Sequence, residues 1–139
     1  MAVERIVVAS DRSETATRAV AWAAEMARRF EAQLTVVQVF VPGPVPEGAE
    51  AALAEYAEEL AGPGTRAQVY AGEEPAAAIV AAAEAEQADV LVVGNIGMSG
   101  RREFLLGNVP NRVSHNARCT VVIVNTAEAE KSRLPWRRG

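Results

Sequence analysis

The chain of 139 residues contains one cysteine, one histidine and seven aromatic residues. A single cysteine excludes an intramolecular disulfide and any zinc site built on several cysteines. A single histidine excludes a metal site with several histidine ligands. No apolar run approaches the roughly 18–20 residues of a membrane span, and residues 1–5 do not resemble a signal peptide. These absences favour a cytoplasmic protein with no membrane partner.

Alanine, by contrast, occupies 28 positions, and half of all residues are hydrophobic. Such a chain is too apolar to be disordered as a whole. Its length is close to the commonest size of one domain, and it can bury a core without a metal or a disulfide. Many alanines and few aromatics favour helices that pack closely against another layer of structure.

The net charge of −4 is unevenly distributed along the chain. Residues 1–100 hold 6 Lys/Arg against 15 Asp/Glu, whereas residues 101–139 hold 8 Lys/Arg against 3 Asp/Glu. Nucleic-acid binding requires a basic face over much of a domain, so the acidic body argues against it. The basic last part leaves room for one local anion site.

Apolar runs of strand length alternate with alanine-rich stretches of helical spacing. Strands are predicted at residues 5–10, 34–41, 66–70, 89–93 and 120–124, and helices at 14–30, 47–60, 75–88 and 108–116. This alternation predicts a single α/β domain over residues 1–126, with an open five-stranded parallel sheet and four helices on both faces. Residues 127–139 are expected to form a flexible basic tail.

Parallel sheets of this kind bind ligands beyond the carboxyl ends of their strands. The loops at residues 10–13, 39–44 and 94–108 are therefore the expected site. Asp11 or Ser13 can cap the helix that begins at residue 14, because both side chains accept bonds from free backbone N–H groups. Asp11 thus has two open roles, as a cap and as a ligand-binding carboxylate, and the two can coexist.

The segment VGNIGMSGRREFLLGNVPNRV, residues 93–113, lies between a buried strand and a helix. Its four glycines allow sharp turns and a close approach of backbone to ligand. The helix start at residues 107–109 offers free N–H groups and a positive dipole end, and Arg101 and Arg102 add charge. This pattern favours a phosphate site, although a loop that needs glycines only for its turns remains the alternative. The segment is neither a Walker A loop nor a dinucleotide fingerprint.

The spacing Gly94-x2-Gly97-x9-Gly107, with Asp11 after the first strand and Ser13 before an alanine-rich helix, resembles the ATP-binding subgroup of the universal stress protein family. The resemblance covers about residues 3–126 and includes LLGNVPNRVSHNARCTVVIV near the C-terminus. It implies a Rossmann-like fold of the adenine nucleotide alpha hydrolase-like type. It also implies binding of ATP or a related adenine nucleotide, and a homodimer formed through the strand at residues 120–125.

The resemblance also implies a set of nucleotide-binding residues. They are Ala9, Ser10, Asp11, Val39, Gly94, Gly97, Met98, Arg101, Gly107, Asn108 and Val109. Asp11 is expected near the ribose and phosphates, where it could hold Mg²⁺ through water. Val39 is expected to face the adenine, with Ala9 as a second apolar wall. The family usually has Ser or Thr at position 108, and the amide of Asn108 can still donate to a phosphate oxygen.

Three functions remain open on the sequence. The first is a stress-response regulatory protein that changes its state or its partner when an adenine nucleotide binds. The second is a slow ATPase, for which Asp11 is the only obvious nearby acid and no general base or catalytic residue is evident. The third is a dimeric interaction module without a ligand, as the resemblance implies for family members that lack the glycine pattern, which is present here except for Asn108. The apolar strand at 120–124, at a sheet edge in this topology, is the physical reason to expect a dimer.

Overall fold

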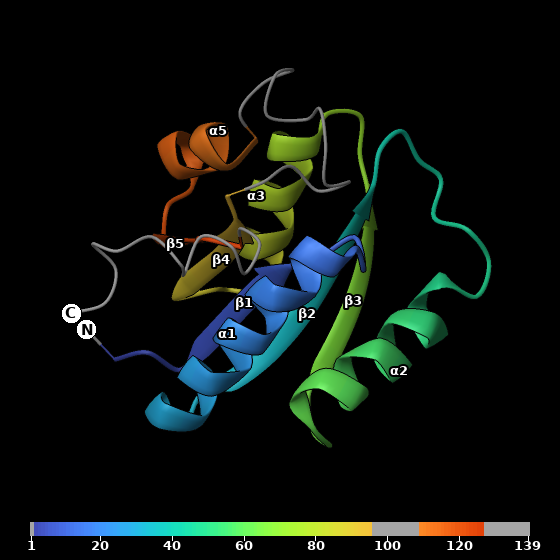
Figure 1. The fold of residues 1–139 in the computed structure, drawn as a ribbon. Coiled ribbons are helices and arrows are strands. Elements are labelled where there is room, and N and C mark those ends of the chain that lie inside the picture. The colour runs from blue at the N-terminus through green and yellow to red at the C-terminus, as the bar shows by residue number, and fades with distance from the viewer. Residues whose placement is uncertain (1, 96–108, 127–139) are drawn as a thin grey trace, which may run out of the picture.

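A computed structural model describes residues 2–95 and 109–126, and Figure 1 shows how they are arranged. Within these ranges, five strands and four helices follow one another in the predicted order. The strands are β1 (Arg5–Ala9), β2 (Gln33–Phe40), β3 (Arg66–Ala71), β4 (Val90–Gly94) and β5 (Thr120–Val124); the helices are α1 (Glu14–Phe30), α2 (Ala49–Ala61), α3 (Pro75–Ala85) and α5 (Val109–Asn116). No helix in these ranges is long and apolar enough to cross a membrane.

The five strands form one parallel sheet with the order β3-β2-β1-β4-β5. β1 lies at the centre, where Val8 is in register with Val36 of β2 and with Val92 of β4. The chain builds the sheet outward from β1 to β3, and then returns to the other side of β1 for β4 and β5. The strand order therefore reverses between β1 and β4, and the carboxyl ends of these strands form the switch point at which open α/β sheets bind ligands.

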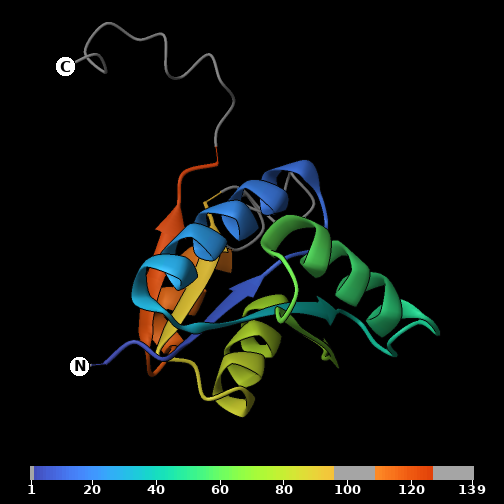
Figure 2. The same cartoon turned by 90° about the horizontal axis from the view of Figure 1, so that it is seen from below.

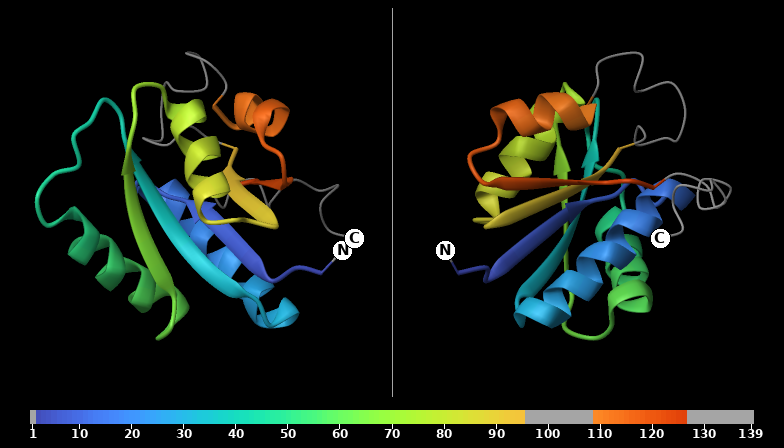
Figure 3. Two further views of the ribbon diagram at one scale, coloured as in Figure 1. Left: turned by 180° about the vertical axis from the view of Figure 1, so that it is seen from behind. Right: turned by 60° about the vertical axis from the view of Figure 1, so that its left-hand side comes forward.

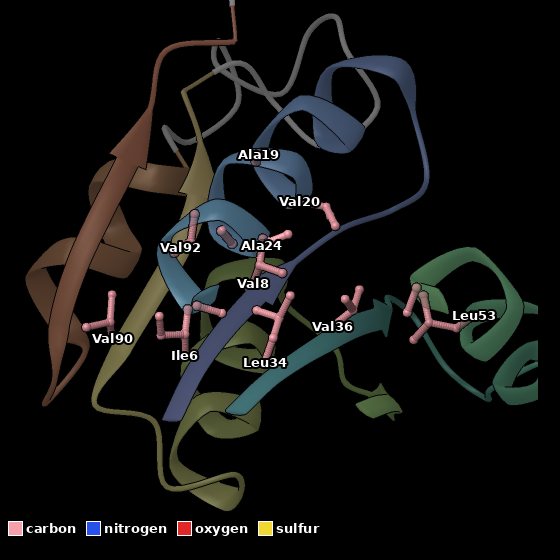
Figure 4. Close-up of a cluster of buried hydrophobic side chains, with 13 residues drawn as sticks. Ile6, Val8, Ala19, Val20, Ala24, Leu34, Val36, Leu53, Val90 and Val92 are labelled. Carbon is pink, nitrogen blue, oxygen red and sulfur yellow. The ribbon is translucent and has the colours of Figure 1, made fainter. Parts of the chain in front are cut away.

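Helices α1 and α2 cover one face of the sheet, and α3 and α5 cover the other (Figures 2 and 3). Successive strand residues point to opposite faces, so each strand supplies two separate cores. On one face, Val8 and Val36 are fully buried in a cluster with Val20 of α1 and Leu53 of α2 (Figure 4). Their neighbours along the strands, such as Val7 and Val37, are buried beneath α3 and α5. The predicted fold class, with its helices on both faces of a parallel sheet, is confirmed.

Local signals account for the helix boundaries. Ser13 caps α1, because its Oγ accepts a hydrogen bond of 3.2 Å from the backbone N–H of Ala16. α2 begins two residues later than predicted, since Gly48 at its N-cap has a φ of 82°, outside the helical region. α3 begins at Pro75, where the missing N–H costs little, and the Glu74 carboxylate caps it by accepting from Ala77 N–H at 2.8 Å.

Candidate functional site

The turn between β1 and α1 holds Asp11 at the carboxyl edge of the sheet. Asp11 Oδ1 accepts a hydrogen bond of 2.9 Å from the backbone N–H of Ser13, which in turn caps the helix. Asp11 and Ser13 therefore both contribute to the helix start, as the sequence allowed. The side chain of Asp11 is half-buried, and its second oxygen has no partner among residues 2–95 and 109–126. The capping role thus leaves one carboxylate oxygen available to a ligand or to a hydrated cation.

A chain of three hydroxyl groups fixes the position of this turn. Ser10, which is fully buried, contacts the Tyr56 hydroxyl of α2 at 2.8 Å, and the same hydroxyl lies 2.9 Å from Thr17 Oγ1 of α1. Ser10 Oγ also accepts from the backbone N–H of Arg12 at 2.9 Å. Because Ser10 is fully engaged and buried, it acts on the site by holding the turn.

Sequence reasoning missed Tyr56 and Thr17. The available signal was modest: Tyr56 is the one aromatic residue in the predicted helix at 47–60, which is otherwise rich in Ala and Glu. A tyrosine has both a large ring to bury and a hydroxyl to satisfy, so it suits a position where a helix meets a polar turn.

Arg12 lies between Asp11 and Ser13 and faces α2. Its φ of 69° is in the left-handed region, so the backbone bends sharply at this point. The guanidinium carbon lies 6.0 Å from the centre of the Tyr56 ring, and Nη1 donates to the Ala52 carbonyl at 3.4 Å. The exposed cation is thus held against α2 next to Asp11 in the chain, where it adds positive charge beside that carboxylate.

The end of β4 forms the other side of the switch point. Since Val8 is in register with Val92, Ser10 and Gly94 lie two residues further along at neighbouring strand ends. Gly94 is followed by Asn95, whose Oδ1 accepts from Thr126 N–H at 2.9 Å and from Thr126 Oγ1 at 3.1 Å. These hydrogen bonds join the residue after β4 to the chain after β5. Gly94 therefore lies between β4, which is held in the sheet, and Asn95, which is held by Thr126.

An apolar wall lines the α3 face of the same edge. Ala9 is buried in one cluster with Val109, the first residue of α5, and Val39 packs against that cluster. The sequence prediction named all three residues, and the fold brings them together. The chain after β2 is held close to the end of β3, because Gly43 N–H donates to the Gly72 carbonyl at 3.2 Å. A Cβ on Gly43 would lie 2.8 Å from that of Ala71, so only glycine fits there.

The remaining predicted site residues lie outside the described residues; they are Gly97, Met98, Arg101, Gly107 and Asn108. The described part of the site therefore consists of the β1–α1 turn, the ends of β2 and β4, and the first residue of α5. No group of three or more His, Cys, Asp or Glu side chains in this part is arranged to hold a metal ion. A magnesium ion near Asp11 would need phosphate oxygens and water for most of its coordination.

A hollow of about 640 Å³ lies at the amino edge of the sheet, opposite the switch point. Glu4, Arg28, Glu31 and Gln33 contribute to its rim, where α1 ends and β2 begins. It faces away from Asp11 and Gly94, on the side of a parallel sheet that is not the usual ligand side. The switch point therefore remains the better candidate site, despite the size of this hollow.

Comparisons with known proteins identify relatives of this chain. The family model described as "Universal stress protein family" matches residues 2–125. Universal stress protein MJ0531 of Methanocaldococcus jannaschii is 30% identical over 145 residues, which cover 91% of this chain and 85% of that protein.

Solved structures give the same result. A universal stress protein in complex with cAMP is 32% identical with a TM-score of 0.73, and the match covers 91% of this chain and all of that one. A universal stress protein from Archaeoglobus fulgidus in complex with dAMP is 26% identical with a TM-score of 0.65, over 90% of this chain and all of that one. The matches thus include proteins that bind adenine nucleotides.

Proposed function

Because the chain belongs to the universal stress protein family, we propose that it binds ATP or a related adenine nucleotide and acts as a nucleotide-dependent switch in a stress response. The observation that carries the proposal is the switch point between β1 and β4. There a carboxylate with one available oxygen lies beside a glycine strand end and an apolar wall. Two solved relatives, bound to cAMP and dAMP, support an adenine nucleotide as the ligand.

The proposed contacts divide between the described residues and the glycine loop. The adenine would lie against the apolar wall formed by Ala9 and Val39, where backbone groups at the strand end can read its edge. Asp11 would accept from a ribose hydroxyl or hold hydrated Mg²⁺. The phosphates would meet the backbone N–H groups at the start of α5, where the helix dipole favours an anion. Gly94 keeps the end of β4 free of side-chain atoms. Gly97, Met98, Arg101, Gly107 and Asn108 complete the proposed site from the sequence.

Calorimetry with purified full-length protein tests the proposal. ATP with Mg²⁺, AMP and cAMP are titrated into the wild type, and at least one is expected to bind. Gly107→Val places a side chain at the phosphate end and is expected to weaken binding by roughly tenfold or more. Asp11→Ala is expected to weaken it by roughly 10–100-fold, the loss expected for one charge-assisted hydrogen bond.

Asp11→Asn is the matched control for the helix cap. Its amide oxygen can still accept from Ser13 N–H, so the thermal stability should stay close to that of the wild type while the Mg²⁺-dependent part of binding is lost. If none of the three nucleotides binds the wild type at millimolar concentration, the proposal is wrong.

We further propose that the switch is a homodimer formed through β5. Among the described strands, β5 pairs only with β4, so its outer backbone edge is open to another strand. Ile123 on this strand is 43% exposed, a large value for an isoleucine. Light scattering at micromolar concentration should give twice the monomer mass, and Ile123→Lys should reduce it. A monomeric wild type would contradict this assembly.

The cytoplasm remains the expected compartment.

A further inference from the structure

An apolar groove lies on the α1 face of the sheet, between α1 and β5. Its volume is about 310 Å³, and of its nine lining residues only Thr120, with its hydroxyl, and Trp22, with its indole N–H, have a polar side-chain N or O atom. Helix α1 contributes Trp22, Met26 and Phe30, and β5 contributes Thr120 and Val122. The groove exists because α1 packs most closely over β1 and β4 and leaves this face of the edge strand only partly covered.

The groove is also where large apolar side chains meet solvent. Trp22 is 36% exposed and Phe30 is 54% exposed. Together with Ile123, they are the exposed large hydrophobic residues in the described part of the chain. Two of these three side chains line one groove, and a gathering of this kind marks an interaction surface.

The chain leaves the sheet directly above this groove. Thr126, only 1% exposed, is the last described residue, and its carbonyl accepts from Arg18 Nη1 of α1 at 2.9 Å. Arg18, Trp22, Met26 and Phe30 recur every fourth residue, so they lie along one side of α1. Thr126, where the described chain ends, is therefore held by Arg18 on the same side of α1 as the groove residues Trp22, Met26 and Phe30.

Thirteen residues follow Thr126, and they contain a compact apolar group, Leu134-Pro135-Trp136. The stripe from Trp22 to Phe30 is about 12 Å long at 1.5 Å per helical residue. The stretch from residue 127 to 136 can span up to about 33 Å, so it has ample length to turn and follow the groove. Arg137 and Arg138 come next, and the exposed residues that adjoin the groove in sequence carry both signs of charge, Glu4 and Glu31 together with Arg5 and Arg29. The length of the segment and the apolar character of Leu134-Pro135-Trp136 thus match the groove.

We propose that the C-terminal segment 127–139 folds back over the groove of its own chain and inserts Leu134 and Trp136 between α1 and β5. The segment covers the face of β5, while the outer backbone edge of that strand stays available to a second copy. The basic charge of the segment then lies against the acidic body of the same molecule. This inference does not depend on nucleotide binding.

Tryptophan fluorescence of the full-length protein tests the docking. The chain has two tryptophans, so Trp22→Phe leaves Trp136 as the only one and keeps an aromatic ring in the groove. We expect acrylamide to quench Trp136 roughly threefold or more weakly than it quenches N-acetyltryptophanamide, because a docked indole is shielded from solvent. Adding Met26→Glu, which places a charge in the groove, should restore full quenching. Ala21→Glu, on the exposed side of the same helix, should leave Trp136 shielded.

Three results would overturn the proposal: quenching of Trp136 as strong as that of the free compound, continued shielding in the Met26→Glu protein, or shielding that disappears on dilution in step with the dimer. The last result would assign the groove to a second copy. If Met26→Glu fails to fold, Leu134→Ser with Trp136→Ser gives an independent test within the tail. This pair should raise the binding of anilinonaphthalene sulfonate severalfold by uncovering the groove, and unchanged binding would contradict the docking.

Discussion

The two edges of the same sheet use their polar groups differently. At the amino edge, polar groups pair with one another: Asp89 Oδ2 accepts from the backbone N–H groups of Glu4 and Arg5 at 2.8 and 2.9 Å. At the carboxyl edge, the hydroxyls of Ser10, Tyr56 and Thr17 hold the turn that carries Asp11, and one oxygen of its carboxylate has no partner within the described residues. The amino edge therefore uses its carboxylate to join strands, whereas the carboxyl edge leaves one oxygen of Asp11 free for the nucleotide binding that we propose.

Asp89 and Tyr70 have pKa values that are shifted by contacts within the fold. The two backbone N–H groups that Asp89 accepts hold the pKa of its carboxyl below the usual value. Burial, and then the hydrogen bond to Glu86 just after α3, raise the pKa of Tyr70 to about 12. Both groups are thus shifted by burial and by hydrogen bonds that belong to the fold.

Among changes to the polar contacts of the two edges outside the proposed nucleotide contacts, the largest effect is expected from breaking the hydroxyl chain of the carboxyl edge. Tyr56→Phe removes the group that links Ser10 with Thr17 and leaves the buried Ser10 without that partner. We expect the free energy of unfolding to fall by about 1–2 kcal/mol and nucleotide affinity to fall by roughly 3–10-fold, because the turn that carries Asp11 loosens. Urea denaturation and calorimetry measure the two quantities. Lower stability with unchanged affinity would show that the turn needs no such support.

At the amino edge, Asp89→Asn should lower stability and leave nucleotide affinity unchanged. The folded-state pKa of Asp89 is below its ordinary value of 3.8, so its charge contributes stability above that pH and loses the contribution as the pH falls through the folded pKa. The stability difference between wild type and variant should therefore shrink on acidification below pH 3.8. Urea denaturation as a function of pH gives this difference. A stability difference between wild type and variant that stays constant down to low pH would contradict a stabilising contribution from the Asp89 charge.

The smallest effect is expected from Tyr70→Phe. The folded-state pKa is raised, so the neutral phenol contributes stability fully below its ordinary value of 10.0 and loses it as the pH rises toward about 12. The variant should be less stable by about 0.5–1 kcal/mol at neutral pH, through loss of one partly exposed hydrogen bond. Its stability should approach that of the wild type in strong alkali, which circular dichroism can follow. Curves that diverge above pH 10 would contradict this assignment.

Much of the fold was predictable because its signals are local. Runs such as Ile6–Ala9 and Thr120–Val124 have strand length and strand composition, and Ser13 and Pro75 mark helix starts. The alternation of these elements predicted the parallel sheet, and the glycine spacing, together with this topology, predicted the family. The boundary of α2 was less predictable, since Gly48 adopts a φ of 82° that no periodic pattern reports.

The sequence by itself determined the elements, the parallel sheet, the family, and Asp11 as the acidic residue at the switch point. Only the tertiary structure decided which distant residues meet there. Tyr56 lies 46 positions from Ser10, and Asn95 lies 31 positions from Thr126. The groove between α1 and β5 likewise depends on β5 being the edge strand. The physical reason is that spacing and capping act over a few residues, whereas strand order and helix packing decide which far-apart side chains share one buried or exposed surface.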